Sequence, residues 1–215
     1  MKRKKLASPS LILDSFQWEE ELQKQGFNAI AGVDEAGRGP LAGPVVAAAI
    51  ILPSDRKLVS SLGIQDSKKV SPKNREEIFE NLKKIAVAFG IGVVDHRTID
   101  EINILQATYT AMRQALFNLK ISCDYVLVDG YQIPALTIPQ QAIIKGDSKI
   151  LSIAAASIIA KVTRDCLMQQ FDEQFPQYGF GKHKGYGTQE HLQRLMNYGP
   201  CEIHRKSFRP VREIV

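Results

Sequence analysis

Apolar residues fall into two patterns along the chain, short continuous runs and longer runs with helical spacing. Short runs bounded by glycine, proline or acidic residues predict buried strands, here at 28–35, 43–53, 87–95, 123–130 and 140–148. Apolar residues at every third or fourth position predict helices, here at 13–26, from 72 onward, behind Thr98, at 148–171 and at 188–197. Strands alternating with helices predict an α/β fold with a mixed β-sheet flanked by helices.

Two helix starts carry capping signals. Ser71 precedes Pro72, and serine is favoured at the N-cap position as proline is at the first helical position. Thr98 and Glu101 have the spacing of a capping box. The helix expected at 148–171 contains the run SIAAASIIAK, whose small side chains should allow it to pack closely on the sheet.

We divide the chain into three parts within one compact unit. Residues 1–27 form a basic arm and a helix, residues 28–178 form the main α/β domain, and residues 179–215 form a small helical C-terminal appendage. The net charge is +5, of which residues 179–215 contribute +4 through seven basic and three acidic residues. A neutral body with a basic end favours a polyanionic partner, and a solvated basic tail is the alternative.

Composition places the protein in the soluble globular class. The 215 residues are 44% hydrophobic and 24% charged, which is ordinary for a single folded domain. No export signal or membrane-spanning apolar run is evident. The three cysteines are widely spaced without a C-x-x-C pair, so a zinc site or disulfide framework is not expected and a reducing cytoplasm fits. We expect a monomer without contact to a membrane.

Four acidic residues occupy positions where apolar segments stop or meet a glycine: Asp34, Glu35, Asp129 and Asp147. Functional groups gather at strand ends in α/β sheets, and converging carboxylates repel one another unless cations neutralise them. Hard cations with oxygen ligands, Mg²⁺ or Mn²⁺, suit such a cluster. Taken singly, each acid has another interpretation, since Asp129 could form a turn and Asp147 could cap the long helix. Neighbouring strand residues also point to opposite faces, so how Asp34 and Glu35 could reach the same ions stays open.

Two glycine-rich segments are candidates for substrate binding. Gly37 and Gly39 allow a tight turn whose N–H groups can hold an anion, and Arg38 between them adds a donor for phosphate or a sugar hydroxyl. In the loop at 181–188, basic side chains and an aromatic ring suit phosphate contact and stacking on a sugar or base; these residues are Lys182, Lys184 and Tyr186. A plain connection and a structural tyrosine are the alternatives.

The C-terminal segment at 202–210 adds three basic residues, Arg205, Lys206 and Arg209. We interpret them as contacts to a nucleic-acid backbone, with a solvated tail as the alternative.

Motifs along most of the chain, from about 28 to 210, resemble the bacterial ribonuclease HII pattern in the same order. They are GVDEAGRGPLAGPV from 32, DSKK at 66–69, VDG at 128–130, KGDSKILSIAAASIIAKVTRD at 145–165, GYGT at 185–188 and HRKSF at 204–208. The resemblance implies a ribonuclease H-like fold. It also implies an endoribonuclease that cuts the RNA strand of RNA–DNA hybrids and DNA containing single ribonucleotides, leaving 5′-phosphate and 3′-hydroxyl ends.

The resemblance further assigns roles to residues. Asp34, Glu35, Asp129 and Asp147 would be the metal-binding acids, whereas Asp165 matches the pattern without a metal role. The turn at 37–39 would recognise the 2′-hydroxyl and adjoining phosphates, and Tyr186 would stack on the deoxyribose beyond the cut. The related ribonuclease HIII family is a near alternative, disfavoured by Arg38 in the glycine motif and by the short N-terminal segment. A non-catalytic nucleic-acid-binding protein is the rival from another class.

Overall fold

A five-stranded mixed sheet forms the centre of the molecule. The computed structural model describes residues 16–64 and 71–214. The strands are β1 (Ile30–Ala36), β2 (Val45–Ile51), β3 (Ala88–Val94), β4 (Tyr125–Asp129) and β5 (Gln140–Ile143), arranged in the order β3-β2-β1-β4-β5. β3, β2 and β1 pair antiparallel, whereas β1, β4 and β5 pair parallel. The mixed sheet expected from the sequence is therefore confirmed, and the motif at 66–69 lies outside the described residues.

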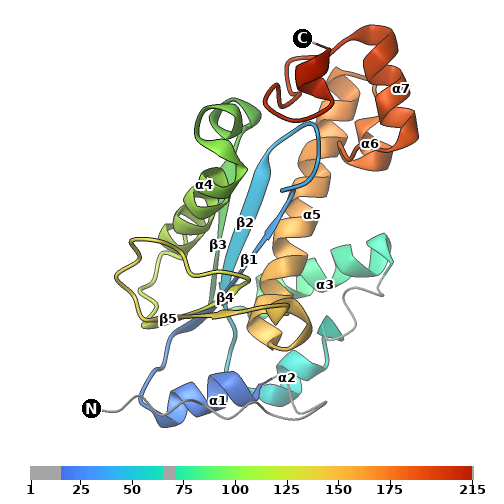
Figure 1. Cartoon of the computed structure of the whole chain (residues 1–215). Coiled ribbons are helices and arrows are strands. Elements are labelled where there is room, and N and C mark those ends of the chain that lie inside the picture. Colours follow the sequence, from blue (N-terminus) through green and yellow to red (C-terminus); the bar gives the residue numbers. More distant parts are fainter. Residues whose placement is uncertain (1–15, 65–70, 215) are drawn as a thin grey trace.

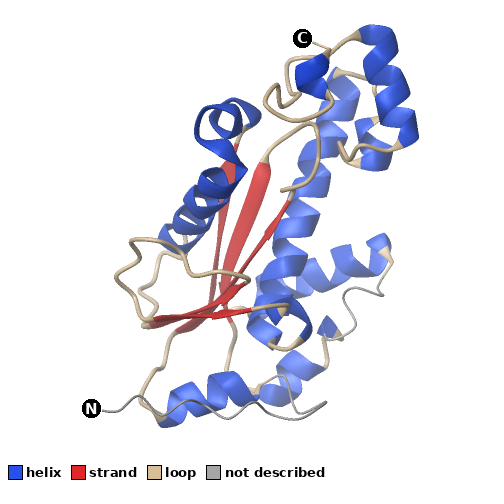
Figure 2. Ribbon diagram, in the orientation of Figure 1, coloured by secondary structure: helices blue, strands red, loops and turns tan. Residues whose placement is uncertain are grey.

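Helices cover both faces of this sheet (Figures 1 and 2). They are α1 (Gln17–Lys24), α2 (Arg56–Ser60), α3 (Pro72–Ile85), α4 (His96–Phe117), α5 (Leu151–Gln174), α6 (Phe180–His183) and α7 (Gln189–Tyr198), with 3₁₀ turns η2 (Gly146–Ser148) and η3 (Val211–Glu213). α4 packs on one face, while α5 and α3 lie on the other. α2 and α6 were not expected, because each spans only one turn and gives no helical period. No helix in the described part of the chain is both long and apolar enough to span a membrane.

α5 lies unusually close to the sheet. A Cβ atom added to Gly32 of β1 would stand 2.2 Å from the carbonyl carbon of Ser152. Ala154, Ala155 and Ala156, which follow on the helix, are buried. The small residues of this run therefore bring the helix backbone against β1, as the sequence predicted.

The capping predictions had different outcomes. Ser71 caps α3 as expected, since its Oγ accepts a hydrogen bond from the Asn74 N–H at 3.3 Å. The capping box at Thr98 was wrong, because α4 begins earlier and its N-cap is Asp95, whose Oδ1 accepts from the Thr98 N–H at 2.8 Å. Aspartate is at least as good an N-cap as threonine.

The C-terminal segments lie beyond the end of β1 and are tied to the loop that joins β1 to β2 (Figure 1). The Leu41 N–H donates to the Gly185 carbonyl at 2.8 Å, and Ala42 forms an isolated bridge with His204. Their interior holds three imidazole rings and two aromatic rings packed together: His183, His191, His204, Tyr178 and Phe180. His191 and His204 are fully buried.

We expect this part of the molecule to lose stability in mild acid. Burial lowers the pKa of His191 and of His204 to about 4, against 6.5 for an exposed imidazole. Between these values the unfolded chain binds more protons than the folded one, so the stability present above pH 6.5 is lost as the pH falls towards 4. At pH 5 the loss is on the order of 2 kcal/mol for one such imidazole.

Urea unfolding at pH 7 and pH 5 measures this loss. The matched comparison is His204→Gln, which keeps every carboxylate and removes one imidazole, so its stability should change less with pH than that of the wild type. Equal slopes for the two proteins would contradict the expectation.

Candidate active site

The ends of β1 and β4 place two carboxylates side by side. Val33 pairs with Val128 in the parallel ladder, so the residues that follow them, Asp34 and Asp129, lie at the same level of adjacent strands. Because side chains alternate along a strand and both valines belong to the core beneath α4, these two carboxylates are directed to the α5 face. Asp34 is only 5% exposed and receives a hydrogen bond from the hydroxyl of Ser157 on α5.

The surroundings of Asp34 and Glu35 disfavour the ionised forms of their carboxyl groups. Burial raises the pKa of Asp34 well above its usual value, and the neighbouring charges of Glu35 and Asp129 raise it further. Burial also raises the pKa of Glu35, although Arg38 lies 3.2 Å from its Oε1 and acts in the other direction. Three carboxylates that disfavour one another's ionisation form a site that a cation would stabilise.

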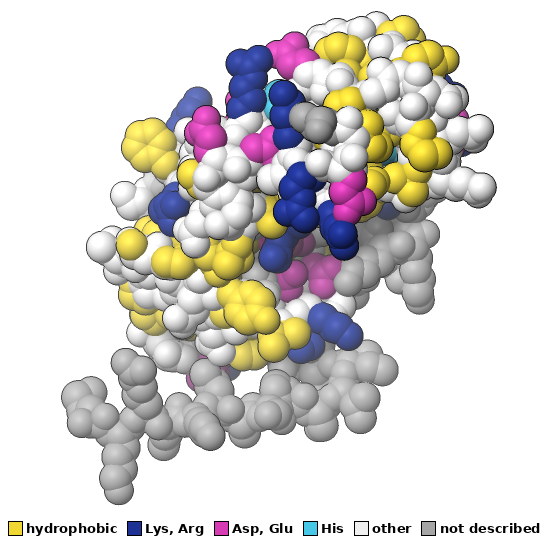
Figure 3. Space-filling view, turned by 45° about the horizontal axis from the view of Figure 1, so that its top comes forward, with side chains coloured by type: hydrophobic (Ala, Val, Ile, Leu, Met, Phe, Trp, Pro, Cys, Tyr) yellow, Lys and Arg dark blue, Asp and Glu magenta, His cyan; other side chains and the backbone are white. Residues whose placement is uncertain are grey.

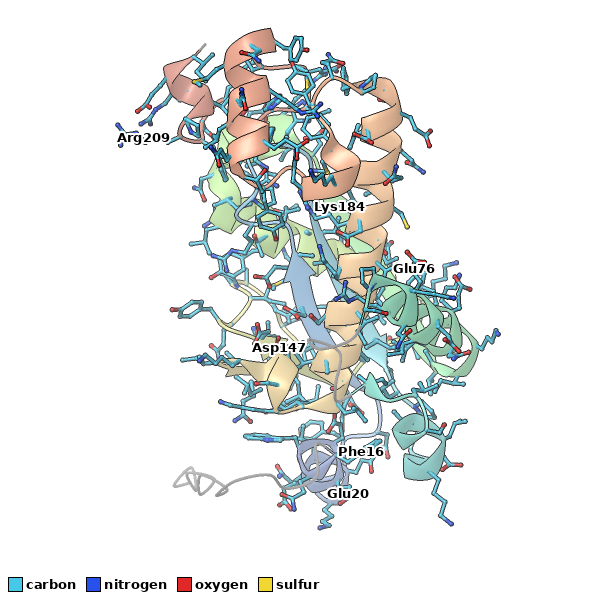
Figure 4. The ribbon with its side chains drawn as sticks, turned by 90° about the vertical axis from the view of Figure 1, so that its right-hand side faces the viewer. Phe16, Glu20, Glu76, Asp147, Lys184 and Arg209 are labelled. Atoms are coloured by element: carbon cyan, nitrogen blue, oxygen red, sulfur yellow. The ribbon has the colours of Figure 1, made fainter. Side chains whose placement is uncertain are left out.

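Asp147 directly follows Gly146, which is hydrogen-bonded to one carboxylate of this cluster. The Gly146 N–H donates to Asp129 Oδ1 at 2.6 Å, which ties the turn η2 to the end of β4. Figure 4 shows Asp147 on this connection between β5 and α5. The alternative that Asp147 caps α5 was wrong, because the N-cap position is Ile150 and lacks a side-chain cap.

The carboxylates available here suit a hard cation whose coordination shell is completed by water and substrate. In the described part of the chain no group of three or more His, Cys, Asp or Glu side chains forms a ready-made metal site. Mg²⁺ is commonly held by one or two carboxylates, with water and substrate phosphate completing the shell. Asp34 and Asp129 can supply such a pair. Pairing of β1 with β2 stays regular through Asp34, Glu35 and Ala36, so the Glu35 side chain starts from the opposite side of the strand to Asp34, and it nevertheless lines the same cleft as Ser157 of α5.

Two buried arginines hold the turn that follows β1. Arg205 donates to the carbonyls of Gly37 (2.6 Å), Arg38 (3.0 Å) and Gly43 (2.9 Å). Arg164 of α5 packs against Gly37, whose φ is +95° and where an added Cβ would lie 2.1 Å from Arg164 Nε. In a trans peptide the N–H points opposite to the carbonyl. The N–H groups of Arg38 and Gly39 are therefore directed away from the guanidinium, which suits anion binding.

The interpretation of Arg205 as a nucleic-acid contact was wrong. Its side chain is fully buried, and burial lowers its pKa to about 9, which leaves it charged at neutral pH. Arg209, by contrast, is exposed and pairs with Glu213 at 2.6 Å. The Lys206 N–H donates to Asp100 on α4 at 2.8 Å, so this segment is anchored to the main domain.

A cleft of about 440 Å³ opens beside the turn. Its lining residues are Glu35, Ala36, Gly37, Arg38, Gly39, Arg75, Ser157, Ile158, Lys161 and Tyr186. The ring of Tyr186 is 43% exposed, and its Cε1 lies 3.8 Å from the position of a Cβ added to Gly39. The turn and the tyrosine, distant in sequence, therefore form one wall.

Three polar residues of this cleft were not anticipated: Arg75, Ser157 and Lys161. Ser157 and Lys161 interrupt the apolar run of α5 at a spacing of four, which places them on one face of the helix. That spacing was the available signal. Lys161 forms an ion pair with Asp165 at 2.6 Å.

The two lysines of the loop at 181–188 differ in their surroundings. Lys182 is exposed and pairs with Glu190 of α7. Lys184 lies on the side of the C-terminal segments that faces the rest of the molecule (Figure 4). Figure 3 shows acidic side chains recessed in the middle of one face, with lysine and arginine side chains around them. Contact of either lysine with substrate stays a prediction.

The fold assigns the chain to the ribonuclease H class of nucleases. The crystal structure of ribonuclease H2 from Pyrococcus horikoshii OT3 matches with a TM-score of 0.74 and 28% identity, covering 87% of this chain and 97% of that one. The amino-acid sequence identifies the family within this class. The family model described as Ribonuclease HII matches residues 31–211.

Two curated relatives illustrate the likeness. Ribonuclease HII of Caldicellulosiruptor saccharolyticus is 55% identical over 90% of this chain and 93% of its own length. Ribonuclease HII of Chlamydia caviae is 52% identical over the full length of both chains. The chain belongs to the ribonuclease HII family and is a metal-dependent endoribonuclease. The resemblance to this family is confirmed over ribonuclease HIII, and the non-catalytic alternative was wrong.

Proposed function

We propose that this endoribonuclease hydrolyses the RNA strand of RNA–DNA hybrids and cuts duplex DNA at single embedded ribonucleotides. The observation that supports this best is the cleft in which Gly39 and Tyr186 form one wall and which is also lined by Ser157, the hydrogen-bond partner of the buried carboxylate Asp34. A turn of two glycines and an arginine can contact a 2′-hydroxyl and its phosphates, and a ring next to it can stack on a sugar. The substrate selected would be an RNA-to-DNA junction, cut to leave 5′-phosphate and 3′-hydroxyl ends.

Asp34, Glu35, Asp129 and Asp147 would hold two divalent cations, Mg²⁺ or Mn²⁺. When bound, such cations supply a water of lowered pKa and stabilise the leaving oxygen of an in-line displacement. Asp34 and Asp129 would do so from adjacent strands, and Ser157 would orient Asp34 through its hydrogen bond. No histidine lines the described cleft, so little acid–base work is asked of the protein.

The remaining contacts would position the nucleic acid. The N–H groups of the turn at 37–39 and the Arg38 side chain would bind phosphate, and Lys182 and Lys184 would meet the backbone further along. Residues 179–215 would act as part of the same unit as 28–178. We also propose a monomer in the cytoplasm, which the three unpaired cysteines support; its protein partners stay unknown.

The test is cleavage of three end-labelled duplexes that carry one ribonucleotide, a uniform RNA strand or DNA alone. With Mg²⁺ or Mn²⁺ the first two should be cut and the third left intact, and EDTA should stop cleavage. Product ends are read by ligation and by polymerase extension. Cutting of the all-DNA duplex at a similar rate would overturn the proposal.

Replacing Tyr186 with alanine should lower kcat/KM for the single-ribonucleotide duplex about tenfold or more, because stacking on one nucleotide contributes about 1–3 kcal/mol. Tyr186→Phe should retain most activity, since the ring remains. Tyr198→Ala is the matched control, because Tyr198 is also exposed (60%) but is not among the residues lining the cleft. Equal kinetics for the alanine variants of Tyr186 and Tyr198 would exclude a stacking role.

A further inference from the structure

Two backbone groups next to the Tyr186 side chain, the Gly185 N–H and the Tyr186 carbonyl, are hydrogen-bonded to buried imidazole rings. The Gly185 N–H lies 3.2 Å from His183 Nδ1, and the Tyr186 carbonyl lies 2.9 Å from His191 Nδ1. The loop has left-handed backbone at Lys184 (φ 53°) and Gly185 (φ 80°), and its glycines give it little preference for one conformation. Within the loop, the Tyr186 N–H donates to the His183 carbonyl and the Thr188 N–H donates to the Tyr186 carbonyl, and contacts from outside the loop add to these in fixing where the tyrosine ring lies.

The hydrogen bonds of these rings determine their tautomers. A carbonyl only accepts, so His191 carries its proton on Nδ1, and its Nε2 must accept. The partner is His204 Nε2 at 3.1 Å, which therefore carries a proton. His204 Nδ1 in turn accepts from the Cys201 backbone N–H at 3.0 Å. A chain of donors runs from Cys201 through His204 and His191 to the carbonyl of Tyr186.

This chain leaves no ring nitrogen for a second proton. A proton added to His191 would set two N–H groups against each other across the 3.1 Å contact with His204, and one added to His204 would lie on Nδ1, against the Cys201 N–H. Both rings are fully buried, so water cannot replace a lost partner at low cost. The two imidazoles thus form a rigid neutral unit. Its hydrogen bond to the backbone is made by His191 to the carbonyl of Tyr186, the residue that lines the cleft.

We propose that His191 and His204 are positioning residues for Tyr186, which hold its ring against Gly39 through the Tyr186 carbonyl. The inference rests on the proposed stacking role of Tyr186 in the cleavage reaction. Small displacements of a positioned group can reduce the rate strongly even when the displacing change is remote. We call the hydrogen-bonded chain from Cys201 through His204 and His191 to the Tyr186 carbonyl the relay. The relay would therefore affect recognition of the RNA-to-DNA junction although neither histidine lines the cleft.

Two substitutions at one position separate the two bonds of His191. Asparagine places an amide N–H near Nδ1 and can keep the bond to the Tyr186 carbonyl, whereas glutamine reaches the Nε2 position and keeps only the contact to His204. We expect His191→Gln to lower kcat/KM for the single-ribonucleotide duplex about tenfold and His191→Asn to lower it less than threefold, because only the glutamine variant loses the bond to the Tyr186 carbonyl. His96→Gln, outside the relay, is the control and should cleave as the wild type does.

A double-mutant cycle with Tyr186→Ala distinguishes positioning from a general structural effect. If the relay acts through the ring, His191→Gln should have no further effect once the ring is absent. His191→Phe, which keeps a ring at this position but loses the bond to the Tyr186 carbonyl, should behave in the same way and serves if the glutamine variant does not fold. Equal loss with and without the Tyr186 ring would overturn the inference. Unchanged cleavage by Tyr186→Ala alone would instead refute the stacking role, and the relay's role would fall with it.

Discussion

Replacing Asp34 with asparagine is expected to lower Mg²⁺-dependent cleavage by about a thousandfold or more while leaving the fold and the binding of the duplex intact. Removing a preorganised electrostatic group from an active site costs about 10²–10³ in rate, and a metal ligand contributes at least as much. Asparagine keeps the shape of the side chain and an oxygen for the Glu35 N–H, but removes the charge that attracts the cation. Single-turnover cleavage and a binding assay in Ca²⁺ measure the two effects separately.

The same variant should be more stable than the wild type when divalent cations are absent. Burial and the charges of Glu35 and Asp129 raise the pKa of Asp34, so its ionised form is disfavoured in the folded protein and stability falls as the pH rises above the unfolded value of 3.8. Saturating Mg²⁺ should stabilise the wild type by about 2.7 kcal/mol at a hundredfold excess over Kd, and Asp34→Asn by much less.

Asp124→Asn is the matched control for both measurements. Asp124 accepts hydrogen bonds from the N–H groups of Asn28 and Ala29 and lies outside the cleft. Its substitution should reduce stability without altering the dependence of cleavage on Mg²⁺. Full activity in Asp34→Asn, or an identical Mg²⁺ effect on its thermal midpoint and that of the wild type, would contradict the metal-binding assignment.

Local patterns were sufficient to predict the strands and the positions of the acids within them. Asp34 and Asp129 each follow an apolar run, and that is a property of a few neighbouring residues. Their lateral contact is different, because it depends on the parallel pairing of β1 with β4, which are separated in the chain by two strands and three helices, β2, α2, α3, β3 and α4. Pairing register over such a distance is fixed by tertiary packing and leaves no local signal.

Arg205 shows where a residue's type misleads. An arginine in a basic C-terminal segment is usually solvated, and a fully buried one needs several acceptors that only the folded loop provides. Those acceptors are carbonyls at 37–44, about 160 positions away, and carbonyls carry no sequence information. The same reason hid Arg164, whose guanidinium donates to Ala42, Pro44 and Lys184.

Replacing Arg205 with alanine is expected to give the largest loss of stability, about 3–5 kcal/mol from a total that is typically 5–15 kcal/mol. The carbonyls of Gly37, Arg38 and Gly43 would lose a charged donor inside the protein, and each unsatisfied buried acceptor is costly. Arg205→Lys should fall between, because an ammonium has no planar fork to reach several carbonyls at once.

Urea unfolding of these variants against Arg97→Ala provides the comparison. Arg97 forms an exposed ion pair with Glu202, which should contribute no more than about 1 kcal/mol. The lysine variant adds a functional readout, since a turn that is folded but loosely held should raise KM for the duplex more than it lowers kcat. An Arg205→Ala protein as stable as Arg97→Ala would mean that the turn holds its shape without the guanidinium. The orientation of the N–H groups of Arg38 and Gly39 would then need another cause.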